Sequence, residues 1–139
     1  MIDDEVSEQL QRLTDCSDFS SQAEELVDTW MSNGVGLEVV DPVLRFMERN
    51  PSILYGMPGA LVHFVERFYG QGYEQALIES IRRRPTPHTV WMLNRVINGT
   101  KALEVKNAYI LELRRARTST TDRNTLERIN QFLDNIMSE

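Results

Sequence analysis

The two histidines are the side chains best suited to acid–base or metal chemistry in this chain. His63 and Glu66 are three residues apart, so on a helix they could form a general-base pair or half of a metal site. No third ligand accompanies them. His88 follows a proline in the first turn of a predicted helix, where the helix dipole favours the neutral imidazole. We expect packing or contact roles for both histidines, and catalysis by His63, Glu66 and His88 is the less favoured alternative.

The remaining residue types give no other catalytic or metal-binding pattern. Cys16 is the only cysteine, so no disulfide can form within the chain, and with two histidines a Cys/His zinc site lacks its ligands. The sequence contains no P-loop, dinucleotide-binding fingerprint, nucleophile elbow or metal-binding helix motif. We therefore predict a protein that is not an enzyme and that uses no cofactor or metal.

Residues 82–84 are three consecutive arginines, the densest basic run in the chain. At the end of a helix, cations complement the exposed carbonyl groups, which explains the run without a ligand. The alternative is a phosphate contact extended by Arg114, Arg115 and Arg117. A pI near 5.0 and the lack of interleaved aromatic residues argue against that alternative. We expect no direct binding to nucleic acid.

The charged residues are divided unevenly along the chain. The first fifty residues carry twelve carboxylates and three arginines, net −9, and the remaining eighty-nine carry nine carboxylates and twelve basic residues, net +3. Such an asymmetry concerns partners rather than fold. One interpretation is a solvated helix face that keeps the protein soluble. The other is an acidic surface that meets a basic partner, with residues 1–19 as a partly mobile acidic segment.

Hydrophobic residues recur with a helical period throughout the sequence, and no segment shows the sustained two-residue alternation of an amphipathic strand. We predict an all-α protein with about seven helices in one domain over residues 1–139. The helices would form stacked antiparallel hairpins of the HEAT type or a compact bundle. Three of them are expected to open at Pro42, Pro58 and Pro87, because proline suits the first turn of a helix. Other helical patterns cover residues 5–14, 21–32, 73–84, 103–117 and 121–137.

One predicted helix separates acidic from apolar residues. Ser21 and Glu24 have the spacing of a capping box, in which each side chain satisfies an amide of the other residue. On the helix that this box would start, Glu24, Glu25 and Asp28 fall mainly opposite the apolar side chains. These three carboxylates would therefore present charge in a fixed pattern.

Residues 50–59 form a predicted loop with unusually apolar content. Ile53 and Leu54 are expected to tuck under neighbouring helices. Tyr55, next to Gly56, could equally project from the loop as an anchor for a partner. We take Tyr55 as a candidate anchor.

The sequence shows no targeting or membrane segment. It begins MIDDE, which is acidic where a secretory signal starts with positive charge, and no window approaches about 18 uninterrupted apolar residues. We expect a cytoplasmic protein that does not bind a membrane.

Three stretches between residues 57 and 100 carry a resemblance to a known class of protein. They are MPGALVHFVERFY at 57–69, YEQALIES at 73–80 and RRPTPHTVWMLNRVINGT at 83–100. Together they resemble small bacterial immunity proteins of polymorphic toxin and contact-dependent growth inhibition systems, over about a third of the chain. The resemblance implies a cytoplasmic, non-catalytic and often acidic protein that binds one cognate toxin domain, frequently a basic nuclease.

The charge pattern and the resemblance lead to one hypothesis. The protein would bind a cognate toxin C-terminal domain and neutralise it by occluding its active site or substrate groove. The alternative is a helical-repeat adaptor that binds a peptide or protein partner with no link to a toxin. The candidate partner-binding residues rest on this sequence alone; they are Glu24, Glu25, Asp28, Glu38, Asp41 and Tyr55.

Overall fold

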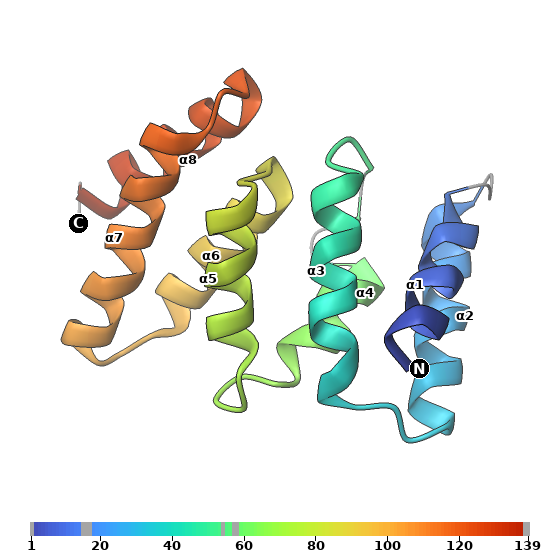
Figure 1. The fold of residues 1–139 in the computed structure, drawn as a ribbon. Helices are drawn as coiled ribbons and strands as arrows, with labels where there is room; N and C mark the ends of the chain where they lie inside the picture. The colour runs from blue at the N-terminus through green and yellow to red at the C-terminus, as the bar shows by residue number, and fades with distance from the viewer. Residues whose placement is uncertain (1, 15–17, 54, 57–58, 138–139) are drawn as a thin grey trace. The chain divides into compact units, whose positions relative to one another are not determined.

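The computed structural model describes residues 2–14, 18–53, 55–56 and 59–137, and every regular element in these residues is a helix (Figure 1). The predicted all-α class is confirmed, with eight α-helices and one 3₁₀ helix in the described residues where about seven helices were expected. The elements are α1 (Ile2–Leu13), α2 (Phe19–Ser32), η1 (Leu37–Val39, the 3₁₀ helix), α3 (Val40–Arg49), α4 (Gly59–Glu66), α5 (Tyr73–Arg83), α6 (Pro87–Gly99), α7 (Leu103–Ser119) and α8 (Arg123–Met137). The predictions for Cys16, Leu54 and Pro58 lie outside the described residues.

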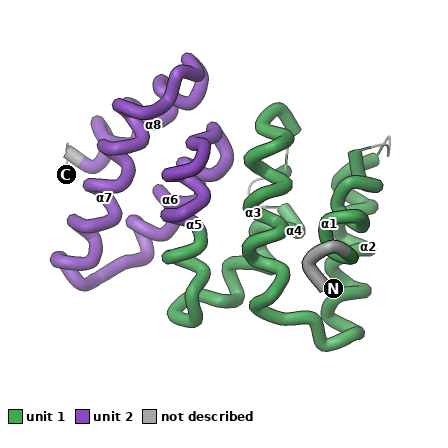
Figure 2. Tube along the Cα trace, in the orientation of Figure 1, with its two compact units in different colours: residues 1–76 green, residues 77–139 purple. Residues whose placement is uncertain are grey.

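Contacts within the chain define two compact units, residues 1–76 and residues 77–139 (Figure 2). The division falls inside α5, between Ala76 and Leu77. Our prediction of one domain over residues 1–139 did not anticipate this division, because the helical pattern of α5 continues through it without a break.

Unit 1 contains two stacked helical hairpins. The first hairpin is α1 with α2 and the second is α3 with α4, and α1 lies on α3 while α2 lies on α4 (Figure 1). Val6, Leu10 and Leu13 recur at intervals of four and three along α1, and all three are buried. Gln9 accepts a 2.8 Å hydrogen bond from Trp30 Nε1, which joins α1 to α2. α1 is thus a packed helix in a segment for which we expected partial mobility.

Two helix starts in unit 1 differ from the predicted ones. α2 begins at Phe19 with Asp18 as its N-cap, and the Asp18 carboxylate accepts a 3.3 Å hydrogen bond from the Ser21 amide. The predicted capping box at Ser21 is therefore wrong, because the aspartate already satisfies this first-turn amide. α3 begins at Val40, two residues before Pro42, because η1 leads directly into it.

Unit 2 contains the last part of α5 with α6, α7 and α8. α6 packs against both α7 and α8, and these two helices also pack against each other. α6 begins at Pro87, as predicted, and its N-cap is Thr86. The Thr86 hydroxyl accepts a hydrogen bond from the Thr89 amide, and the Thr89 hydroxyl accepts one from the Thr86 amide, each at 3.1 Å. This reciprocal cap satisfies two amides at the start of the helix.

Candidate functional site

The three carboxylates predicted on the second helix lie on the exposed side of α2. Glu24, Glu25 and Asp28 are exposed, whereas Ala23 and Trp30 are buried. α2 contains no basic residue, and among the described residues no side-chain hydrogen bond or ion pair engages these three carboxylates. Their negative charge is therefore directed to solvent. We call Glu24, Glu25 and Asp28 the acidic α2 surface.

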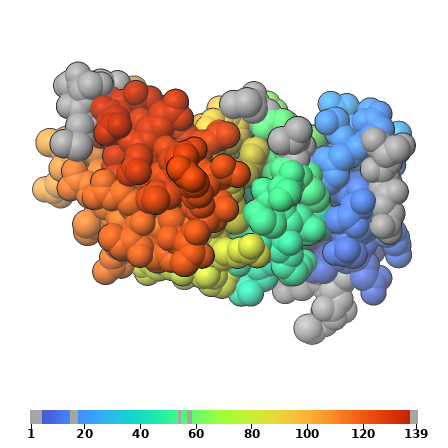
Figure 3. Space-filling model, turned by 90° about the horizontal axis from the view of Figure 1, so that it is seen from above, coloured from blue at the N-terminus to red at the C-terminus, as the bar shows by residue number. Residues whose placement is uncertain are grey.

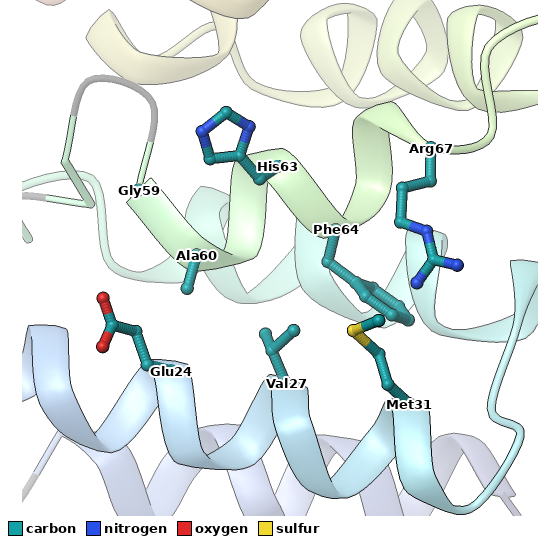
Figure 4. A pocket seen from close by; sticks show the side chains of 8 residues that line it. All are labelled: Glu24, Val27, Met31, Gly59, Ala60, His63, Phe64 and Arg67. Atoms are coloured by element: carbon teal, nitrogen blue, oxygen red, sulfur yellow. The ribbon is translucent and has the colours of Figure 1, made fainter.

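A groove lies between α2 and α4, next to the acidic α2 surface (Figure 4). Its volume is about 320 Å³, at the small end of the range for ligand pockets. Its middle is apolar, and Met31 on its wall is 51% exposed. The lining residues are Glu24, Val27, Met31, Gly59, Ala60, His63, Phe64 and Arg67. We call this feature the α2–α4 groove.

Helical spacing aligns the residues of this groove. Glu24, Val27 and Met31 follow each other at intervals of three and four along α2, so they share one face of that helix. Ala60 and Phe64 are four apart on α4 and share a face in the same way. Because α2 packs on α4, these two rows face each other across the groove.

Opposite charges lie at the two ends of the groove. Figure 4 shows Glu24 at the end near Ala60 and Arg67 at the end near Met31. The guanidinium carbon of Arg67 lies 5.5 Å from the centre of the Phe64 ring, a cation–π contact that helps to hold the positive charge there. The groove therefore offers an apolar middle with an anionic end and a cationic end.

Two further predicted acids interact with their own surroundings. Asp41 Oδ2 accepts a 2.8 Å hydrogen bond from Arg45 Nε, and both side chains are about half exposed. Hydrogen bonds from the backbone amides of Glu38 and Gly36 lower the pKa of the Glu38 carboxyl. Both acids are exposed, but each already has a local partner. They are weaker candidates than the acidic α2 surface.

Tyr55 does not project from the loop, contrary to its role as a candidate anchor. Its side chain is 4% exposed, and its ring packs edge-on against Phe19 and Phe46 with centroids 5.7 and 6.3 Å away. The Tyr55 hydroxyl donates a 2.7 Å hydrogen bond to the Asn50 carbonyl, and burial raises the pKa of the phenol. Tyr55 thus holds the loop against unit 1.

The two histidines lie in different units and in different surroundings. His63 is exposed and belongs to the lining of the α2–α4 groove (Figure 4). His88 belongs to unit 2 and contacts the Trp91 ring at 5.1 Å. Burial, with a smaller effect from the Arg128 charge, lowers the pKa of His88 to about 4. In the described part of the chain no group of three or more His, Cys, Asp or Glu residues is arranged to hold a metal ion.

The basic run at residues 82–84 has a protein partner that sequence reasoning missed. Arg82 donates hydrogen bonds from Nε and Nη2 to the Oε2 and Oε1 atoms of Glu112, at 3.1 and 2.5 Å. Glu112 is 8% exposed, and Arg115 lies 3.6 Å from the same carboxylate. The hydrogen bond from Arg82 is the main cause of the lowered pKa of Glu112. This pairing gives Arg82 a structural role.

Comparison of the chain with protein-family models, with curated proteins and with solved structures gave no match. Among the described helices, none combines the length and the apolar content needed to cross a lipid bilayer.

Proposed function

We propose that this protein is an immunity protein that binds a cognate toxin domain and occludes its active site or substrate groove. The kind of toxin that we favour is a basic nuclease. The observation that carries the proposal is an unneutralised acidic surface directly beside an apolar groove, with Glu24 belonging to both. The resemblance of residues 57–100 to immunity proteins supports it, and this segment includes α4, one wall of the groove. The protein would act in the cytoplasm, where such a toxin has its substrate.

The acidic α2 surface would supply attraction. A nuclease holds nucleic-acid phosphates with lysine and arginine side chains, and carboxylates can occupy the places of those phosphates. Because Glu24, Glu25 and Asp28 have no ion-pair partner among the described residues, binding would break no salt bridge on this side. Electrostatic steering of this kind raises association rates to about 10⁸–10⁹ M⁻¹s⁻¹ at low salt.

The α2–α4 groove would slow the dissociation of the complex. Charge alone gives fast encounter, whereas a long-lived complex needs an anchor buried in a well-packed pocket. Because Tyr55 is buried inside unit 1, the anchor would come from the toxin, as an apolar side chain inserted between Val27, Met31 and Phe64. A toxin cation near Glu24 and a toxin anion near Arg67 would complete the contact.

Coexpression with the protein encoded beside this one tests the proposal. The wild-type chain should protect cells from that toxin. The Glu24→Lys, Glu25→Lys, Asp28→Lys variant should lose protection, and its association rate at low salt should fall at least about tenfold. The matched control makes the same change of charge at three exposed acids of unit 2, Glu104, Glu127 and Asp134, and should protect like the wild type.

Two results would contradict different parts of the proposal: one concerns the binding surface and the other the immunity function. Normal toxin binding by the α2 variant, with unchanged salt dependence, would exclude the acidic α2 surface as the toxin-facing side. A wild-type chain that binds its neighbour without protecting cells would favour the adaptor function. The apolar groove also suits an adaptor, because amphipathic helices bind such grooves through a row of apolar side chains.

A further inference from the structure

α7 carries an exposed row of side chains that is not uniformly polar. Leu103, Asn107, Leu111, Arg114 and Thr118 are separated by four, four, three and four residues, so they form one stripe along the helix. All five are exposed, with Leu103 at 70% and Leu111 at 55%. We call this row the outer stripe of α7. In Figure 3 the hairpin of α7 and α8, coloured orange to red, covers a continuous part of the surface of unit 2.

The charge of α7 is positive on its accessible side. Glu112 is buried and paired with Arg82. The remaining charged residues of α7 are one acid and four bases, namely Glu104, Lys106, Arg114, Arg115 and Arg117. Leu103 and Leu111 thus expose apolar surface on a helix side whose net charge is positive, a combination that suits a protein contact.

The acidic α2 surface and the α2–α4 groove match this stripe in both charge and spacing. On α2 the apolar Met31 lies three residues from Asp28, and on α7 the apolar Leu111 lies three residues from Arg114. A rise of about 4.5 Å, just under one helical turn, thus separates the apolar residue from the charged residue on each helix. The charges are opposite, so both contacts can form together.

We propose that the outer stripe of α7 in one copy of this chain docks onto the acidic α2 surface and the α2–α4 groove of a second copy. Leu111 enters the apolar groove near Met31, and Arg114 and Arg117 face the acidic residues of α2. The contact joins two different surfaces, so it is a heterologous contact between copies. It goes beyond the proposed immunity function and does not depend on the existence of a toxin.

The contact has a consequence for the proposed function. Self-association and toxin binding use the same groove, so each excludes the other. Because the docked surface carries only a few charge pairs and two leucines, the contact is weak enough for a tightly binding toxin to displace it.

Sedimentation velocity of the purified full-length chain over a concentration series tests the proposal. The wild type should self-associate at about 10 mM NaCl and less at about 150 mM, because the Debye length falls from about 30 to about 8 Å. Leu111→Ser should weaken association. Val105→Ser, at an exposed apolar position of α7 outside the stripe, is the matched control and should not.

Charge reversal identifies the two surfaces. Glu24→Lys with Asp28→Lys, and separately Arg114→Glu with Arg117→Glu, should each lower the association constant by about tenfold or more, the scale of two exposed charge pairs. An equimolar mixture of the two variants should recover association, because each reversed surface then meets its complement. A wild type that stays monomeric at low salt overturns self-association and leaves the toxin proposal to its own coexpression test. Variants that associate like the wild type, or a mixture that does not recover, also overturn it.

Discussion

Arg82 and Glu112 are thirty residues apart in sequence, and their side chains join α5 to α7 through two hydrogen bonds of 3.1 and 2.5 Å. Glu112 is buried, whereas the Arg82 side chain is about half exposed. A buried carboxylate is stable only when it is hydrogen-bonded and paired with a cation. Arg82 provides both, and it thereby fixes the register between two helices of unit 2.

Glu112→Gln should lower the free energy of unfolding by about 1–3 kcal/mol at neutral pH, because it removes the charge from a buried hydrogen-bonded pair. The Glu112 pKa is lower in the folded protein than its ordinary value of 4.5. Its stabilisation is therefore complete above about pH 4.5 and is lost as the pH falls through the lower folded-state pKa. Urea unfolding of both proteins between neutral and acid pH measures the difference, which should shrink at acid pH.

The control for this prediction is Glu127→Gln. Glu127 lies 3.5 Å from Arg123, but both side chains are largely exposed, so its loss should change the unfolding free energy by less than about 0.5 kcal/mol. Equal effects of the two substitutions would contradict the role assigned to Arg82 and Glu112.

Tyr55→Phe tests whether Tyr55 stabilises the fold or contributes to toxin binding. It removes only the hydroxyl that donates to the Asn50 carbonyl, so the unfolding free energy should fall by about 1 kcal/mol. Association with the toxin should be unchanged, because the ring stays buried between Phe19 and Phe46. Urea unfolding and binding kinetics measure the two effects. A slower association of Tyr55→Phe with the toxin would restore Tyr55 as an anchor.

Helices were predictable here where the start signals are local. Pro87 begins α6 as predicted, because proline and the preceding Thr86 act within one turn. The start of α2 was missed because Asp18 and Ser21 are both good N-cap residues, and local sequence does not decide between them. The packing of α1 was not predictable from its acidic composition, since it depends on contacts with α2 and α3.

The candidate site was likewise predictable from the sequence only in part. The exposure of Glu24, Glu25 and Asp28 follows from the helical period of α2, and the sequence predicted it. The groove that adjoins them was not predicted, because its walls, residues 24–31 and 59–67, are far apart in sequence and meet only in the folded chain. Tyr55 was misjudged for a related reason: whether a loop side chain is buried depends on neighbours such as Phe19, which local spacing does not reveal.

His88→Gln should remove a pH dependence of stability that the wild type shows in mildly acidic solution. The folded-state pKa of His88 is about 4, below its ordinary value of 6.5, because the ring is buried and near the Arg128 charge. Between these values the unfolded chain binds more protons, so stability is complete above about pH 6.5 and falls as the pH drops toward 4. The loss is at most about 3 kcal/mol, and it can be measured by urea unfolding at intervals across this range. The exposed His63 is the matched control: His63→Gln should leave the dependence in place, and a His88→Gln protein that keeps it would show that another group causes it.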